Sequence, residues 1–160
     1  MTAQTMQIRN RPCRIYGEPH AEYLLLQMTG EHEVQSMDDE VAAIAQSAHQ
    51  FLFAAIPVEN WNDALSPWKS PAVWGKQGFG GNAADTLRFL TEQIIPSLKQ
   101  QYPLPENVKI ILGGYSLAGL FALWASTQAN LFCGIAAASP SVWFPGWMEF
   151  ERSEERRVGK

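Results

Sequence analysis

The sequence of 160 residues predicts an α/β fold, a three-layer α/β/α sandwich built on a mostly parallel sheet. Apolar runs of strand length alternate along the chain with segments whose apolar residues recur at helical spacing. Strands that alternate with helices pair in parallel through right-handed crossovers, and the helices then cover both faces of the sheet. Because ligands of such sheets bind at the carboxyl ends of the strands, we expect a functional site at that edge.

The first part of the chain contains predicted strands on both sides of one predicted helix. Residues 6–17 alternate loosely and are expected to form one or two edge strands, a position that suits Pro12. Residues 23–28 and 51–58 are apolar runs typical of buried strands, and residues 37–48 between them carry their apolar side chains on one helical face.

A long loop over residues 59–81 is the next predicted segment. It is rich in tryptophan, proline and glycine, and a loop of this length in a compact domain is usually functional. The glycine cluster at residues 78–81 lacks the Lys-Ser/Thr pair of a phosphate-binding loop. A helix over residues 82–101 follows, with Asn82 as its predicted N-cap and a kink expected at Pro96.

The second part of the chain predicts strand, helix and strand in turn. Residues 108–112 form the first strand, and four apolar side chains mark the buried face of the helix after it: Leu117, Leu120, Phe121 and Trp124. Residues 132–138 form the last predicted strand. Cys133, which introduces that strand, is predicted to be a buried and unreactive thiol.

The junction between strand and helix reads Gly114-Tyr115-Ser116-Leu117-Ala118. A serine on a sharp turn between a strand and a helix is typical of a nucleophile elbow, in which small neighbours allow the close approach of the two elements. Ser116 is therefore the candidate nucleophile, and the backbone N–H of Leu117 at the helix start is the candidate oxyanion donor. The alternative interpretation is an ordinary strand-to-helix turn.

Composition excludes several classes of function. The net charge of −4 without a basic stripe argues against a nucleic-acid partner, and no apolar run approaches the roughly 20 residues of a membrane span. No apolar stretch follows the basic residues near the N-terminus, so we expect a cytoplasmic protein. The two cysteines and three histidines lack metal-binding spacing, so we expect neither a metal nor another cofactor.

Four stretches together resemble a known family: residues 62–68, Gly80-Gly81, residues 113–123 and residues 136–143. The run from about Glu22 to Trp147 resembles the α/β-hydrolase superfamily, and more closely the esterase family that includes esterase D and the enterochelin esterases. The resemblance implies a partial α/β-hydrolase fold and a serine hydrolase that acts on small-molecule carboxylic esters.

The resemblance also implies roles for individual residues. Ser116 matches the family's nucleophile, and the second oxyanion donor maps to Thr29 or Gly30. Two positions depart from the pattern, because Tyr115 stands where histidine is commoner and Ala118 replaces the usual glycine.

Several aromatic side chains are candidates for binding the substrate. Tyr115 adjoins the nucleophile, and four tryptophans of the neighbouring loops are candidates to line an aryl or acyl pocket: Trp61, Trp68, Trp143 and Trp147. Packing in the core beneath the loops is the alternative for each tryptophan.

The rest of the catalytic triad is missing from the expected place. In this fold the acid and then the histidine follow the serine in the chain, yet no histidine follows Ser116. His32 lies nearer the predicted site edge than His20 or His49, but a solvated loop histidine is the simpler interpretation.

Residues 152–160 are highly charged and resemble the translation of a DNA-sequencing adapter. We therefore expect residues 1–151 to be a partial α/β-hydrolase domain, residues 152–160 to be a non-native tail, and the natural chain to continue past about Glu151 with the acid and the histidine. A genuine charged tail is the alternative. The first hypothesis is therefore an esterase that is inactive in this form. The second is a non-catalytic binding module or an inert fragment. Neither hypothesis specifies an oligomeric state.

Overall fold

The computed structural model describes residues 3–158 of the chain, without the side chains of His32, Val34 and Val158. Within that range six strands form one sheet in the order β1-β2-β4-β3-β7-β8. Their bounds are β1 (Gln4–Ile8), β2 (Arg11–Gly17), β3 (Tyr23–Thr29), β4 (Phe51–Pro57), β7 (Lys109–Tyr115) and β8 (Gly134–Ala138). The β1 and β2 strands pair antiparallel, whereas β4, β3, β7 and β8 are parallel, so the predicted mostly parallel sheet is confirmed. Of the two N-terminal strands only β1 is an edge strand, because β2, which contains Pro12, lies between β1 and β4.

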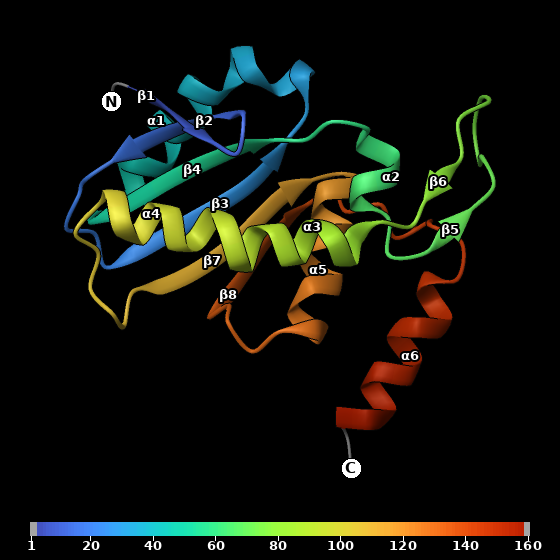
Figure 1. Ribbon diagram of the computed structural model, residues 1–160. Helices are drawn as coiled ribbons and strands as arrows, with labels where there is room; N and C mark the ends of the chain where they lie inside the picture. Colours follow the sequence, from blue (N-terminus) through green and yellow to red (C-terminus); the bar gives the residue numbers. More distant parts are fainter. Residues whose placement is uncertain (1–2, 159–160) are drawn as a thin grey trace.

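Helices cover both faces of the sheet, which confirms the predicted three layers. One face packs against α1 (Met37–Ser47). The other packs against a long helical run and the helix after the elbow, namely α3 (Ala83–Phe89), the π-helical η2 (Leu90–Ile94), α4 (Ile95–Gln101) and α5 (Leu117–Gln128). Figure 1 shows the long run crossing in front of the sheet, and the strands β3, β4 and β7 ending at one common edge.

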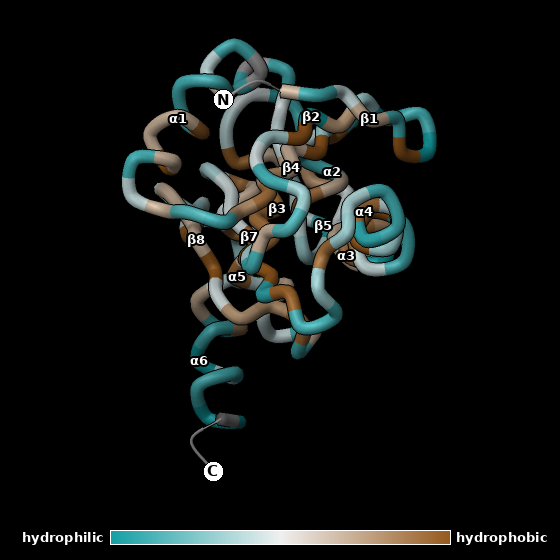
Figure 2. The backbone as a smooth tube through the Cα atoms, turned by 90° about the vertical axis from the view of Figure 1, so that its left-hand side faces the viewer, coloured by the Kyte–Doolittle hydropathy of each residue, from teal (hydrophilic) through white to brown (hydrophobic). Residues whose placement is uncertain are grey.

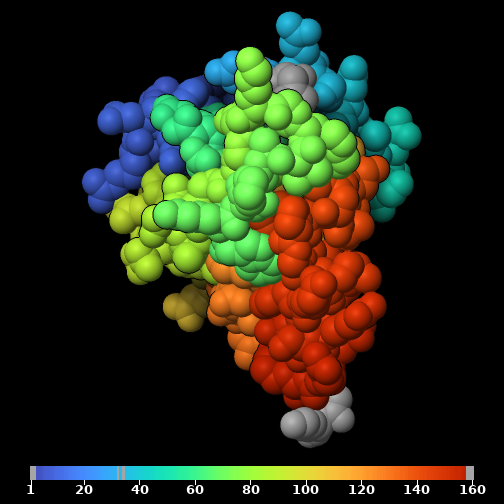
Figure 3. Space-filling model, turned by 90° about the vertical axis from the view of Figure 1, so that its right-hand side faces the viewer, coloured from blue at the N-terminus to red at the C-terminus, as the bar shows by residue number. Residues whose placement is uncertain are grey.

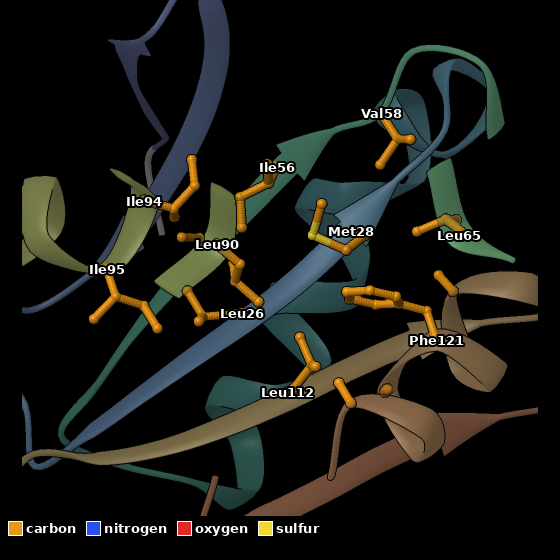
Figure 4. Packing of buried hydrophobic residues seen from close by; sticks show 14 of the residues in the cluster. Leu26, Met28, Ile56, Val58, Leu65, Leu90, Ile94, Ile95, Leu112 and Phe121 are labelled. Atoms are coloured by element: carbon orange, nitrogen blue, oxygen red, sulfur yellow. The ribbon is translucent and has the colours of Figure 1, made fainter. Parts of the chain in front are cut away.

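The alternation of side chains along each strand explains why both faces need a cover. Leu26 and Met28 of β3 point into the larger core, where Figure 4 shows them between Ile56 of β4 and Leu112 of β7. Leu25 of β3 points to the opposite face and packs against the smaller core beneath α1. Parallel strands buried on both sides read as continuous apolar runs, as these do.

The long helix departs from regular geometry where the sequence predicts a kink. The backbone forms the π-helical turn η2 immediately before Pro96, whose ring nitrogen has no hydrogen to donate. The predicted cap at Asn82 is wrong in its chemistry, because the Asn82 side chain makes no capping bond. Its backbone N–H instead donates to the Asp63 carbonyl at 2.8 Å.

The segment predicted as a long loop contains regular structure. A short helix, α2 (Trp61–Leu65), begins it, and the strands β5 (Lys69–Ser70) and β6 (Phe79–Gly80) pair antiparallel. In Figure 3 these green residues meet the orange-red segment around residues 140–150 on one face of the molecule. Trp68 contributes to this junction, because its ring nitrogen donates to the Pro145 carbonyl at 2.8 Å.

The chain ends in helix α6 (Trp147–Val158), which extends away from the sheet (Figure 1). Its first turn is anchored by Trp147, which is buried, while Figure 2 shows most of its length in the teal of hydrophilic residues. The segment predicted as a tail is therefore helical as far as Val158, and its last two residues lie outside the described range. Over residues 3–158, no helix combines the length and the apolar character that crossing a membrane requires.

Candidate active site

Ser116 stands at the sharp turn between β7 and α5, at the carboxyl edge of the sheet. Its backbone adopts φ 57° and ψ −119°, a conformation that a residue with a side chain rarely takes. The turn is possible because Gly114 has no side chain where the chain folds back towards Ala118. The side chain of Ser116 is exposed, as a nucleophile that must meet a substrate requires.

The turn is fixed by hydrogen bonds to the end of the neighbouring strand. The Ser116 N–H donates to the Ala138 carbonyl at 3.0 Å, and the Ser141 N–H donates to the Ser116 carbonyl at 3.1 Å. Pro140 packs on the start of α5, since a Cβ added to Gly119 would lie 3.2 Å from the Pro140 Cα. Two backbone hydrogen bonds and the packing of Pro140 therefore connect the segment after β8 to the elbow.

A second serine meets the candidate nucleophile directly. The hydroxyl oxygens of Ser116 and Ser141 lie 3.1 Å apart, and Ser141 is only 2% exposed. Sequence analysis did not identify Ser141 as a functional residue, because the contact joins positions 25 residues apart. The sequence offers two signals: Ser141 shortly follows the predicted strand at residues 132–138, and it lies within residues 136–143, one of the stretches that resemble the esterase family.

A hollow of about 350 Å³ opens beside Ser116. Trp61 and Trp143, both predicted to bind the substrate, line it, and so do Trp74 and Phe79. The rings of Trp74 and Trp143 meet edge to face with their centroids 4.5 Å apart. The lining also includes the amine-bearing side chain of Lys76 at the tip of the β5–β6 hairpin.

Two of the candidate tryptophans do not line this hollow. Trp68 packs against Phe144 and Phe150 at the junction with α6, and Trp147 is buried in the core. For these two, the alternative interpretation of core packing is correct. Trp74 was missed as a lining residue because its position depends on the β5–β6 hairpin, which the sequence does not reveal.

The predicted oxyanion donors lie on two sides of the site. Leu117 lines the hollow beside Ser116, and as the first residue of α5 its N–H has no acceptor within the helix. Gly30 lines an adjacent hollow of about 370 Å³ that shares Trp61 with the first. Thr29 is buried at the end of β3, and its carbonyl accepts the Val58 N–H at 2.9 Å.

Tyr115 is directed away from the other candidate residues. Its side chain lines a separate hollow with Glu33, Ser36 and Glu40, on the α1 side of the sheet. The negative charge of Glu40, partial burial and the charge of Glu33 raise the pKa of the Tyr115 phenol. The structure therefore does not bring Tyr115 together with the tryptophans that line the hollow of Ser116.

Two of the three histidines lie at the wrong end of the sheet for catalysis. His20 precedes β3 and His49 precedes β4, whereas Ser116 follows the carboxyl end of β7, which is parallel to both. The backbone of His32 lies on the correct edge, in the 3₁₀ helix η1 (Glu31–Ser36). Among the residues that the structure describes, no three His, Cys, Asp or Glu side chains gather in a group that could hold a metal ion.

Comparison with solved structures shows the same fold in several hydrolases. An IroE-like serine hydrolase from Shewanella oneidensis superposes with a TM-score of 0.82 at 20% identity, over 99% of this chain and 57% of that protein. The siderophore hydrolase EstA from Aspergillus nidulans gives 0.68 at 19% identity, over 96% and 61%. The enterobactin hydrolase IroE, solved in complex with DFP, gives 0.62 at 18% identity, over 92% and 66%. The chain therefore spans about three fifths of the length of these proteins.

Comparison of the sequence itself identifies the family. Among curated protein sequences, none matches the chain. The model of one family, described as Putative esterase, matches residues 29–157, a range that contains the elbow, the hairpin and the Ser139-Pro140-Ser141 segment. Since this match covers most of the chain, the protein belongs to that esterase family.

Proposed function

We propose that this chain carries the nucleophile of a serine hydrolase that acts on carboxylic esters of small molecules. The observation that carries the proposal is the position of Ser116, exposed on a strained turn beside a hollow lined by tryptophans. Membership of the esterase family supports it, as does the shared fold with proteins described as serine and siderophore hydrolases.

In the proposed reaction, the Ser116 hydroxyl oxygen attacks the ester carbonyl carbon while its proton passes to a general base. The carbonyl oxygen becomes an oxyanion, which the N–H of Leu117 and a donor at Gly30 or Thr29 would bind. The base returns the proton to the leaving alcohol, and water then hydrolyses the acyl-serine ester to release the carboxylic acid and regenerate the Ser116 hydroxyl. Trp61, Trp74 and Trp143 offer an apolar surface that suits an aryl or acyl group of the substrate.

In the usual triad order of this fold, the histidine that acts as the general base follows the serine in the sequence. No histidine follows Ser116 in this sequence. We therefore propose that the chain in this form hydrolyses esters weakly or not at all, since loss of one triad member lowers the rate by orders of magnitude. The same observation favours the second candidate function, a non-catalytic binding module or inert fragment with the esterase fold. A cytoplasmic location and the lack of a nucleic-acid partner remain predictions from composition.

Labelling with a fluorophosphonate probe tests the proposal. The wild-type chain, Ser116→Ala and the control Ser126→Ala, which alters an exposed serine of α5, are compared by the mass of the phosphonylated protein. Labelling of the wild type and the control but not of Ser116→Ala would show an activated nucleophile, and hence a base within these 160 residues. Folded protein that takes up no label would favour the non-catalytic alternative.

A further inference from the structure

We propose that Ser141 is a positioning residue for the nucleophile: its hydroxyl holds the Ser116 hydroxyl oxygen in one orientation towards the tryptophan-lined hollow. The inference rests on the proposed function of Ser116. It goes further, because it gives a mechanistic role to a residue outside the nucleophile, the base and the oxyanion donors. The contact that suggests it is the 3.1 Å separation of the two hydroxyl oxygens.

Burial makes this contact obligatory for Ser141. At 2% exposure the Ser141 side chain is almost fully shielded from water, and a buried hydroxyl needs a hydrogen-bond partner within the protein. Its partner in the structure is the Ser116 hydroxyl. A change in the orientation of Ser116 would leave the Ser141 hydroxyl unpaired, so burial of one serine restrains the other.

The backbone holds Ser141 in place independently of its side chain. Its N–H donates to the Ser116 carbonyl at 3.1 Å, and its own carbonyl accepts the Phe144 N–H at 3.0 Å. Phe144 is buried against Phe79 and Trp68, so the segment is anchored on both sides. Removal of the Ser141 hydroxyl should therefore leave the backbone contact with the elbow intact.

Ser116 needs such a restraint because little else fixes its side chain. The residue is exposed, and a serine side chain has three staggered orientations. Attack on a carbonyl requires one of them, and a displacement of about 1 Å can lower a rate a hundredfold. Either hydroxyl can donate in the resting pair. As the Ser116 proton passes to the base, the Ser141 hydroxyl keeps its own proton and donates to the Ser116 oxygen, which forms the new bond to the carbonyl carbon.

The experiment compares four proteins. In Ser141→Ala the hydroxyl is lost, and in Ser141→Thr it is retained. The control Ser66→Ala removes another buried serine hydroxyl, which accepts the Gly81 N–H at 2.8 Å but does not line the hollow. Crystal structures report the orientation of the Ser116 side chain in each protein. Fluorophosphonate labelling at varied probe concentration separates the maximal labelling rate from the probe affinity.

We expect a single Ser116 orientation in the wild type, Ser141→Thr and Ser66→Ala, and at least two in Ser141→Ala. The maximal labelling rate of Ser141→Ala should fall at least roughly tenfold with unchanged probe affinity, and Ser141→Thr should restore it. A single, unchanged orientation in Ser141→Ala, or an unchanged maximal rate in a wild type that does label, would overturn the proposal.

The two proposals fail in different ways. If the wild type takes up no label but Ser116 loses its single orientation in Ser141→Ala, the positioning role stands, and the result counts against an activated nucleophile in this chain. If labelling proceeds equally in all four proteins, the hydrolase function stands and the positioning role falls. Should Ser141→Ala not fold, Ser141→Cys retains the volume with a weaker hydrogen bond, and it must then show the second orientation of Ser116.

Discussion

Gly114 and Ala118, the first and last residues of the elbow motif, are in contact across the turn: a Cβ added to Gly114 would lie 2.7 Å from the Cβ of Ala118. The methyl group of alanine at position 118 is accommodated because Gly114 contributes no side chain. The strand β7 and the helix α5 can therefore approach closely enough to place Ser116 on the sharp turn between them.

Gly114→Ala is expected to destabilise the protein by about 1–3 kcal/mol, because the added methyl group has no room. Urea denaturation measures the change. Adding Ala118→Gly should restore only part of the loss, since the new Cβ would still lie 2.6 Å from the carbonyl carbon of residue 118.

Gly134→Ala is the matched control for Gly114→Ala. Its Cβ would meet only the Ile111 Cγ1 at an ordinary 3.7 Å, so a change within about 0.5 kcal/mol is expected. Equal losses in Gly114→Ala and Gly134→Ala would show that the elbow is not tightly packed.

Ser116→Gly is expected to be more stable than Ser116→Ala by about 1 kcal/mol, because glycine adopts the observed φ of 57° without strain. Both substitutions remove the hydroxyl, so the difference between their unfolding free energies reports the backbone strain, less the larger entropy that glycine gives the unfolded chain. The same pair of substitutions at Ser126, inside α5, should give the opposite order, since glycine is a poorer helix former than alanine. An equal stability of the two Ser116 variants would mean that the turn is not strained.

Local patterns in the sequence were sufficient for much of the fold. Residues 23–28 and 51–58 are apolar runs, the first interrupted only by Gln27, and the structure has β3 and β4 there. The elbow was recognisable because small residues directly follow a strand and precede an apolar helix, all within about ten positions. Such signals are local, and burial in the parallel sheet reinforces them.

Other features depend on contacts between distant segments, which no local pattern encodes. The strands β5 and β6 are two residues long, too short for a periodicity. The contact of Ser141 with Ser116 requires β7 and β8 to be neighbours in the sheet. The position of Trp74 beside Trp143 requires both the hairpin and the segment after β8.

Trp74→Ala is expected to weaken the binding of acetanilide, an unreactive analogue of phenyl acetate, roughly two- to tenfold, the effect of losing one aromatic contact. Trp74 is 67% exposed, so its loss should leave the stability almost unchanged. Titration followed by NMR measures the binding of acetanilide, and urea denaturation measures the stability.

Trp68→Ala is the control and should show the reverse, with binding retained and about 3 kcal/mol of stability lost, because Trp68 packs between Phe144 and Phe150. Undiminished binding by Trp74→Ala would remove this residue from the site.

The two cysteines are expected to differ in reactivity. Cys133 was predicted to be buried, and this is wrong: it is exposed, because it precedes the edge strand β8 rather than lying within the sheet. Cys13 is fully buried in β2. A thiol reagent such as DTNB at pH 8 should therefore modify one cysteine of the native protein rapidly and the second only on unfolding. Loss of the rapid phase in Cys133→Ser assigns it, and rapid modification of both cysteines in the native protein would contradict the burial of Cys13.

The stability of the protein is expected to fall above pH 9 through Cys13. Burial raises the pKa of the Cys13 thiol from 9.0 to about 11, an effect that the charge of Arg11 only partly offsets. The folded state then holds the Cys13 proton at pH values where the unfolded state has lost it. The contribution is fully present below pH 9 and disappears as the pH rises towards 11. Between pH 8 and pH 10 the loss of this contribution lowers the unfolding free energy by about 1 kcal/mol.

Cys13→Ala should be less stable than the wild type at pH 8, because removal of the buried sulfur leaves a cavity. It should lose less stability than the wild type between pH 8 and pH 10. Parallel pH profiles of the two proteins would show that the Cys13 pKa is not raised by burial.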